Sequence, residues 1–371
     1  MKLLFWFSVF LVFYAYALYP IWLFFRARLR PRPIHREPIF PTVSIVIAVR
    51  NEETHLEEKS SNLELLDYPA ELMTTIVVSD GSTDRTNDIL RKLVGSRVRS
   101  IVLPAHGGKA EALNRGLETV EGEIVVFMDA RQHVATDAIK TLVQNFADPA
   151  VGCVSGALVL ANSEQNTPRG IESYWEMEKA IRHWESMGGS VVGATGALYA
   201  VRRSLVPNLP AGLILDDVFI PMTVARNGAR VIFEPQARAW DSLSSSTKQE
   251  FRRKVRTLFG NYQLLRLAPW LLTAANPLRF EFISHKLSRL AVPFAVIAMI
   301  LASIFLSGPI YRVPFFAAVA ISTFCTLGFV GVPLGSVSRL THLALAFVLL
   351  NTAAIVAFYY FAIGKKEVWV H

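Results

Sequence analysis

Acidic and amide side chains follow three short apolar segments of this 371-residue chain. The segments and the residues after them are Val43–Val49 with Arg50-Asn51-Glu52-Glu53, Ile76–Ser79 with Asp80-Gly81-Ser82, and Glu123–Met128 with Asp129-Ala130-Arg131. Apolar, β-branched runs of this length are typical of buried parallel strands, and the carboxyl ends of such strands line the ligand crevice of an open α/β sheet. The sequence therefore predicts a polar binding site at one sheet edge. For Asp80 alone, an ordinary strand-turn-helix junction with Asp84 as N-cap fits equally well.

Seven motifs occur in order between Pro41 and Gln263: SIVIAVRNEE, VVSDGSTD, GGKAEALNRG, VVFMDA, ATGALYAVRR, LDDVFIP and FRRKVRT. In type and order they resemble the family 2 glycosyltransferases, the membrane-bound group that includes the cellulose, chitin and hyaluronan synthases. The resemblance implies a GT-A-like (Rossmann-like) α/β nucleotide-sugar domain with a mostly parallel sheet, plus transmembrane helices. It also implies an enzyme that uses a nucleotide-diphosphate sugar, with UDP as the expected nucleotide.

The resemblance assigns the donor side of the site. Asp80 would accept from the nucleobase edge, Glu52 would contact the nucleoside, and Lys109 would lie near the uracil or the phosphates. The full set expected to bind the nucleotide sugar is Ala48, Glu52, Asp80, Lys109, Asp129, Arg131, Arg253 and Arg256. Surface charge on loops is the alternative for these side chains, and a shared place at carboxyl ends of strands argues against it.

Asp129 matches the first acid of the family's DxD motif, in which two carboxylates bring Mg²⁺ or Mn²⁺ to the pyrophosphate. Arg131 stands where the second acid is expected. We expect metal dependence to be retained through Asp129, phosphate oxygens and water, since Mg²⁺ often needs only one or two protein carboxylates. Arg131 would either point at the pyrophosphate as a fixed positive charge or turn outward to a salt bridge with Glu234 or Asp137.

Asp216 and Asp217 match the acidic pair whose second member is the catalytic base in these synthases. A base that directs attack from the face opposite the leaving nucleotide gives inversion, so an α-linked donor would yield a β-linkage. From this segment alone, a helix cap is the more common role for such acids. The ordered motifs before the pair favour Asp217 as base and Asp216 as its partner.

The acceptor side is expected to include Thr195, Gly196 and Trp369, where Gly196 permits close backbone approach. Arg253 and Thr257 stand where the family's QxxRW motif has Gln and Trp, and Arg256 matches its arginine. Because the missing ring stacks on the acceptor sugar in processive enzymes, single-sugar transfer to a lipid stays open beside polymer synthesis. The predicted helix Gly170–Met187 has a stripe of apolar and aromatic residues close to helical spacing, and we expect these side chains mostly to pack in the core, with an acceptor-facing role as the alternative. The members of this stripe are Tyr174, Trp175, Met177, Ile181 and Trp184.

Composition points to a chain that lies partly in lipid. Hydrophobic residues make up 52% of the sequence and the mean hydropathy is +0.35, which is more apolar than a soluble enzyme needs. The net charge of +8 and the pI near 9.5 come from basic residues beside apolar segments, which suits anionic lipid and phosphates rather than nucleic acid. The two cysteines, Cys153 and Cys325, imply no disulfide framework.

Four apolar runs have the length of a membrane crossing, which takes about 20 helical residues: Leu3–Phe25, Leu287–Leu306, Val313–Val332 and Leu340–Ile363. Arginines follow the first run directly, so the positive-inside rule places that flank and the following domain in the cytoplasm of a bacterial-type inner membrane. A cleaved signal peptide is the alternative, but the run is too long and lacks a cleavage site. Four crossings would put the tail outside, whereas Lys365 and Lys366 favour the inside, so the side of the tail stays open.

The predicted domains are an N-terminal transmembrane helix (1–25), a basic proline-rich linker (26–41), a cytosolic GT-A domain (42–241), interfacial amphipathic helices (242–284), about three transmembrane helices (285–363) and a tail (364–371). The expected partners of the protein are the nucleotide sugar, a saccharide or lipid-linked acceptor and membrane lipid, with no nucleic acid. A membrane transporter is the alternative from another class, but the sequence has no internal repeat or intramembrane acid to support one.

Overall fold

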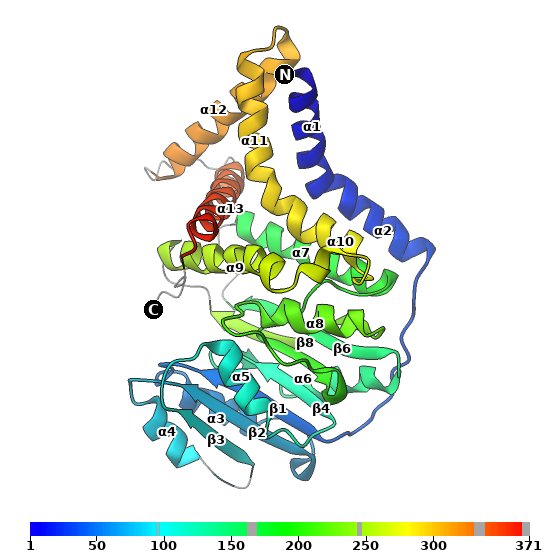
Figure 1. Cartoon of the computed structure of the whole chain (residues 1–371), viewed down its shortest axis with the longest axis vertical. Coiled ribbons are helices and arrows are strands. Elements are labelled where there is room, and N and C mark those ends of the chain that lie inside the picture. The colour runs from blue at the N-terminus through cyan, green and yellow to red at the C-terminus, as the bar shows by residue number, and fades with distance from the viewer. Residues whose placement is uncertain (94, 96, 162–168, 243–246, 330–337, 366–371) are drawn as a thin grey trace.

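The computed structural model describes the chain except residues 94, 96, 162–168, 243–246, 330–337 and 366–371. It has a sheet domain at one end and a tapering group of helices at the other (Figure 1). The predicted role of Trp369 falls outside the described residues.

An eight-stranded sheet forms the centre of the domain, in the order β3-β2-β1-β4-β7-β6-β8-β5. Its strands are β1 (Val43–Val49), β2 (Met73–Asp80), β3 (Val98–Leu103), β4 (Ile124–Met128), β5 (His133–Val134), β6 (Val151–Ala161), β7 (Leu198–Arg202) and β8 (Arg230–Ser242). The pairs β2–β3, β1–β2, β1–β4 and β6–β8 are parallel, whereas β7 is antiparallel to both β4 and β6, and β5 is antiparallel to β8. The predicted, mostly parallel α/β sheet is thus confirmed.

Helices cover both faces of this sheet because its strands are apolar on both sides. One core contains Val46 and Val78 with residues of α5 (Lys109–Leu117) and α8 (Asp216–Arg226). The other contains Ile45 and Ile47 with residues of α3 (Leu56–Glu64), α4 (Thr86–Leu93) and α6 (Ala138–Val143). Successive residues of β1 therefore point to opposite cores.

The helical part begins with α1 (Lys2–Phe13) and α2 (Tyr19–Leu29), which a π-helical turn over Tyr14–Leu18 joins. It continues with α7 (Arg169–Gly188), α9 (Thr247–Leu267), α10 (Arg279–Phe282), a second π-helical turn over Ile283–Leu287, α11 (Ser288–Ile304), α12 (Pro309–Phe329) and α13 (Ser338–Ala362). Helices α1 and α11 pack together, and α13 packs on α9 and α7. The amino terminus and the α11–α12 turn lie at the end farthest from the sheet (Figure 1).

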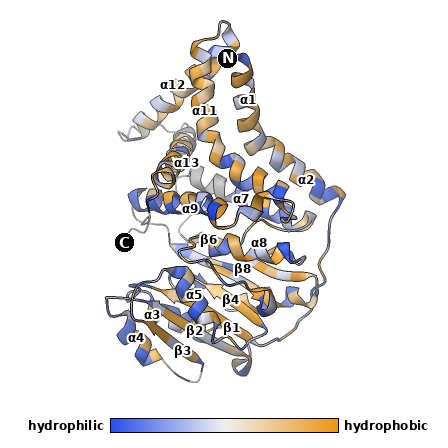
Figure 2. Cartoon of the chain, viewed as in Figure 1, coloured by the Kyte–Doolittle hydropathy of each residue, from blue (hydrophilic) through white to orange (hydrophobic). Residues whose placement is uncertain are grey.

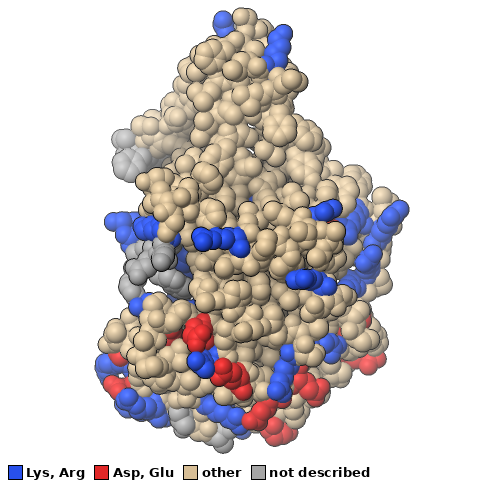
Figure 3. All heavy atoms as spheres, in the orientation of Figure 1, with Lys and Arg blue, Asp and Glu red and all other residues tan. Residues whose placement is uncertain are grey.

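Three helical segments are long and apolar enough to cross a membrane: Lys2–Leu29, Arg279–Ile304 and Pro309–Leu327. The fourth expected crossing falls on α13, and the part of it over Phe347–Ala362 is an apolar helical stretch. Hydrophobic residues dominate α1, α11 and α12 (Figure 2). In the face shown by Figure 3, acidic residues gather on the sheet domain, whereas basic residues also lie in a band between it and the helical surface and again at the far tip of the helices.

Candidate functional site

The three predicted strand ends meet at one edge of the sheet because β2, β1 and β4 are parallel neighbours. Asp80 ends β2, Asn51 and Glu52 follow β1, and Asp129 follows β4. The loops after β1 and β2 interlock: Thr83 N–H donates to Asn51 Oδ1 (2.8 Å) and Glu52 N–H donates to Thr86 Oγ1 (2.9 Å). This interlock gives the two loops a common, fixed position.

Asp80 is buried and binds a loop of the protein itself. Its carboxylate accepts from Gly107 N–H (2.7 Å) and Gly108 N–H (3.0 Å) and lies 2.7 Å from His106 Nδ1. The close approach of this loop to the end of β2 requires glycine at position 81. Gly81 has a φ of +59°, and a Cβ on it would lie 2.5 Å from His106 N. Asp80 therefore holds the loop that leads into Lys109 and α5.

The remaining donor-side residues around β1 have simple surroundings. Ala48 is half-buried near the end of β1. Glu52 is also half-buried, and its Oε2 lies 2.8 Å from His55 Nδ1. Asp84 accepts from Thr86 N–H (3.0 Å), which is the capping role considered for it in the sequence.

Lys109 lies among three carboxylates. Its Nζ is 3.0 Å from Asp129 Oδ1 and 3.1 Å from Asp216 Oδ1. Burial alone would lower the pKa of Lys109, but Asp129, Asp216 and Asp217 raise it well above its ordinary value. The ammonium therefore stays charged and holds the acids of β4 and α8 together.

Gly196 lies between the two acids expected to act on donor and acceptor. A Cβ on this residue would be 3.4 Å from Asp217 Oδ2 and 3.6 Å from Asp129 Oδ2. Burial and the charge of Asp216 raise the pKa of Asp217 to about 6, although Lys109 and Lys286 lower it. A carboxylate with this pKa can accept a proton near neutral pH.

Asp216 is more deeply buried than Asp217 and is fully engaged by protein groups. Tyr199 Oη donates to its Oδ2 (2.9 Å), while Lys109 is bound to its Oδ1. Tyr199 in turn stacks on Phe127 with ring centroids 4.8 Å apart. Asp216 therefore orients Lys109 and the start of α8, and Asp217 is the freer acid of the pair.

Arg131 makes a bidentate ion pair with Asp241 at the end of β8, with Nε 3.0 Å from Oδ1 and Nη2 2.7 Å from Oδ2. The salt bridge considered in the sequence thus forms, but its partner is Asp241 and not Glu234 or Asp137. Asp241 also accepts from Gln132 Nε2 (3.1 Å) and lies 3.9 Å from Arg253 Nη1. This acid joins the loop after β4 to α9.

The acceptor-side residues lie in the segment between α7 and β7. Thr195 N–H donates to Ser155 Oγ (3.0 Å), and Ala194 N–H donates to the backbone oxygen of Asp217 (2.7 Å). These bonds fix the segment against β6 and α8, so Gly196 stays beside the base.

The stripe in α7 packs inward where its side chains are described. Ile181 is buried in a cluster with Tyr19 and Leu23, and Met177 and Trp184 pack against that cluster. The ring of Trp184 also meets Phe24 edge to face at 5.4 Å. These contacts favour core packing against α2 for this part of the stripe.

Comparison with known proteins identifies the family of one part of this chain. Residues 44–209 match the model of glycosyl transferase family 2. These residues are a family 2 glycosyltransferase domain.

Relatives of this glycosyltransferase domain are named for different products. Over 230 residues the chain is 26% identical to the poly-beta-1,6-N-acetyl-D-glucosamine synthase of Staphylococcus aureus (strain COL). This match covers 60% of this chain and 55% of that protein. Over 179 residues the chain is 32% identical to the beta-monoglucosyldiacylglycerol synthase of Nostoc sp. (strain PCC 7120). This match covers 46% of this chain and 37% of that protein. The chain thus spans about half the length of the first relative and less of the second.

A solved structure shares the fold of the whole chain. It is a mannosyltransferase from Pyrobaculum calidifontis in complex with GDP-Man and Mn²⁺, with a TM-score of 0.73 and 23% identity. The likeness covers 98% of this chain and 99% of that one. The arrangement of sheet domain and apolar helices is therefore shared with a known protein.

Some residues around the candidate site were missed by sequence reasoning. Gln263 on α9 accepts from Ile214 N–H (3.1 Å) and donates to Gly212 O (2.9 Å), just before Asp216. Gly260 lies so close to this segment that a Cβ would be 2.6 Å from Leu215 Cγ. Tyr199 lies within a matched motif and Gln263 six residues after the end of another, which was the available signal, whereas nothing near Asp241 in the sequence indicates Arg131.

Proposed function

We propose that this chain transfers a sugar from a nucleotide-diphosphate sugar, with UDP as the expected nucleotide, to a saccharide or glycolipid acceptor at a membrane. The main support is the convergence of Asp129, Asp216 and Asp217 around Lys109 at the carboxyl edge of the sheet. Such a cluster offers a positive group for a diphosphate and a nearby base for a hydroxyl. The apolar helices beside the domain support the membrane location, with the catalytic domain in the cytoplasm.

The donor is assigned to the Asp80, Lys109 and Asp129 side of the site. Glu52, Ala48 and the Asp80 loop would border the nucleoside, while Lys109, Arg253 and Arg256 would balance the diphosphate charge. Arg256 is exposed, and Arg253 is half-buried beside Asp241. Arg131 has a supporting role in this proposal, because Asp241 engages the Nε–Nη2 edge of its guanidinium through both carboxylate oxygens.

A divalent ion fits this donor side. Asp129 is partly exposed, and one carboxylate with phosphate oxygens and water suffices for many Mg²⁺ sites. Within the described residues, no group of three or more His, Cys, Asp or Glu side chains forms an all-protein site. Asp129 would hold Mg²⁺ or Mn²⁺, which supplies positive charge to the departing diphosphate.

Asp217 is the proposed base. It takes the proton of the acceptor hydroxyl while that oxygen forms a bond to the anomeric carbon of the sugar. The bond from the anomeric carbon to the diphosphate oxygen breaks, and its electron pair leaves with the nucleoside diphosphate. Attack from the face opposite the nucleotide inverts the anomeric centre, so an α-linked donor gives a β-linkage.

A second candidate is the transfer of one sugar to a lipid without chain elongation. Thr257 favours it, because this exposed threonine stands where processive relatives of the synthase group are expected to have an aromatic ring. The acceptor would then be lipid-linked, and the product would not grow with time.

Incubation of membranes holding the full chain with radiolabelled nucleotide sugars tests both proposals. The panel includes UDP-glucose, UDP-N-acetylglucosamine and GDP-mannose, and the labelled product is sized and its anomeric configuration determined. A labelled polymer supports the first candidate, and a labelled lipid with one sugar supports the second. An α-linkage from an α-linked donor contradicts the inverting mechanism, and membranes of an Asp217→Asn variant provide the background.

A further inference from the structure

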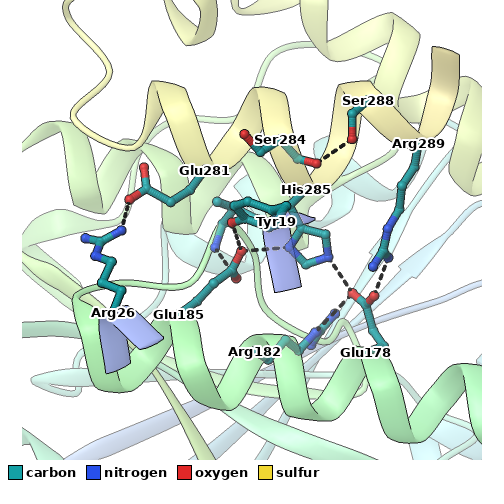
Figure 4. Close-up of polar contacts among 11 residues, drawn as sticks. Tyr19, Arg26, Glu178, Arg182, Glu185, Glu281, Ser284, His285, Ser288 and Arg289 are labelled. Atoms are coloured by element: carbon teal, nitrogen blue, oxygen red, sulfur yellow. Dashed lines mark hydrogen bonds and ion pairs between the residues drawn. The ribbon is translucent and has the colours of Figure 1, made fainter. Parts of the chain in front are cut away.

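A buried polar network joins the amino-terminal helices, α7 and the start of α11 (Figure 4). Tyr19 Oη donates to Glu185 Oε1 (2.8 Å), and His285 Nδ1 lies 2.8 Å from the same oxygen. His285 Nε2 lies 3.0 Å from Glu178 Oε1, and Arg289 Nη1 donates to Glu178 Oε2 (2.6 Å). The side chains of Glu185 and His285 are 0% and 2% exposed.

This network tolerates little movement. Both ring nitrogens of His285 face carboxylate oxygens, which only accept hydrogen bonds when ionised. Burial would raise the pKa of Glu178, but His285 and Arg289 hold it well below its ordinary value. Buried charges are stable only with well-aligned partners, so a shift of one helix strains the others.

Glu185 also reaches toward the catalytic side with its second oxygen. Val192 N–H donates to Glu185 Oε2 at 3.5 Å. Two residues further on, Ala194 N–H donates to the backbone oxygen of Asp217 (2.7 Å). Gly196, beside the carboxylates of Asp217 and Asp129, ends the same segment. One carboxylate thus binds the apolar helices on one oxygen and the acceptor-side segment on the other.

A neighbouring contact joins the same helices without a bond to that segment among those described. The hydroxyls of Tyr14 and Ser284 lie 2.7 Å apart, which joins the two π-helical turns. Arg26, which pairs with Glu281 between α2 and α10, is a poorer comparison, because a Cβ on Gly189 would lie 3.3 Å from its Nη2. If the network served only to hold the helices together, the Tyr14 contact and the Tyr19 contact would have the same effect on the catalytic side.

We propose that Glu185 is a positioning residue that couples the apolar helices to the acceptor side of the catalytic site. A shift of α2 or of the π-helical turn with His285 moves Glu185, which releases Val192 and changes the place of Ala194 and Gly196 relative to Asp217. The donor side, built on β2 and α5, has no contact with this network among the bonds described. The consequence for acceptor use rests on the proposed function, but the coupling itself does not.

Hydrogen exchange of the full chain in lipid nanodiscs tests the coupling without any substrate. Tyr19→Phe removes the hydroxyl that donates to Glu185, and Tyr14→Phe removes a hydroxyl between the same helices that does not. We expect amides in the segment 189–196 to exchange roughly fivefold to tenfold faster in Tyr19→Phe, and at the wild-type rate in Tyr14→Phe. Glu185→Gln, which keeps the volume of the side chain, should give the same increase.

Equal exchange in all variants, or an equal increase in the two tyrosine variants, overturns the proposal. If either Tyr19→Phe or Glu185→Gln fails to fold, the other decides by the same criterion. Exchange of the 189–196 amides in wild type, after transfer of the chain from nanodiscs into detergent, gives a third comparison. In the transfer assay, Tyr19→Phe should raise KM for the acceptor several-fold and leave UDP affinity unchanged. An absence of transfer by wild type would refute the proposed function and leave the exchange result intact.

Discussion

Arg131 and Asp241 lie 110 residues apart in the sequence and face each other through two parallel contacts of 3.0 and 2.7 Å. The arginine takes the place of an acid in a metal-binding motif, yet it contacts a carboxylate of the protein. Its role in this arrangement is to hold the loop after Asp129 against the end of β8.

We predict that Arg131→Ala lowers the free energy of unfolding by about 2 kcal/mol, because it leaves the buried Asp241 with fewer donors. Activity against free Mg²⁺ and Mn²⁺ should follow the wild-type curve after scaling for folded protein. Arg91→Ala, which removes an exposed ion pair to Asp88, is the control and should cost under about 0.5 kcal/mol. A changed metal response in Arg131→Ala would instead place this arginine at the diphosphate.

Asp217→Asn should reduce transfer by at least about a hundredfold, because the amide cannot take the acceptor's proton. Calorimetry should show UDP affinity close to wild type, since the change keeps the volume and leaves the donor side intact. Asp216→Asn should reduce transfer less and lower stability more, because its carboxylate binds Tyr199 and Lys109. Equal losses of transfer in the two variants would leave the base unassigned.

The rate of transfer should fall as the pH decreases through about 6. Burial and Asp216 raise the pKa of Asp217 to about 6, so the base becomes protonated and inactive below that pH. Asp216→Asn removes one of the charges that raise this pKa, so the midpoint of the acid limb should move to lower pH. The check is kcat/KM against pH for both proteins, and a midpoint that stays or rises contradicts the assignment.

Gly81→Ala should destabilise the protein by about 1–3 kcal/mol and weaken UDP binding. The backbone at Gly81 has a positive φ, and a Cβ there would meet the backbone of Ala105 and His106 at 2.6 and 2.5 Å. Asp80→Ala should weaken UDP binding for a related reason, because it releases Gly107 and Gly108. Gly95→Ala, where a Cβ meets nothing within 4 Å, is the matched control for thermal unfolding and calorimetry.

Local patterns predicted the half of the domain in which neighbours in sequence are neighbours in space. Val43–Val49 is β1 as expected, the run before Asp129 contains β4, and the helix after Gly108 is α5. Parallel pairing of these strands follows from their alternation with helices. The antiparallel insertion of β7 between β4 and β6 has no such signal, because strand order depends on long-range packing.

Long-range polar contacts were the part of the site that sequence could not supply. Motif positions gave Lys109, Asp129 and the Asp216-Asp217 pair, and the structure brings these residues together. The predicted ion-pair partners of Arg131, Glu234 or Asp137, were wrong, because the sequence does not distinguish these acids from Asp241. The buried network of Tyr19, Glu185 and His285 joins segments up to 266 residues apart, so no local spacing indicates it.

Helix α9 carries Arg253 near one end and Gln263 near the other, and the two lie at opposite borders of the site. Arg253 faces Asp241, and Gln263 holds the backbone that leads into Asp216. At 1.5 Å per residue the helix fixes their separation along its axis at about 15 Å. Any tilt of α9 therefore moves both borders together, and turnover should vary with the acyl-chain length of the surrounding lipid.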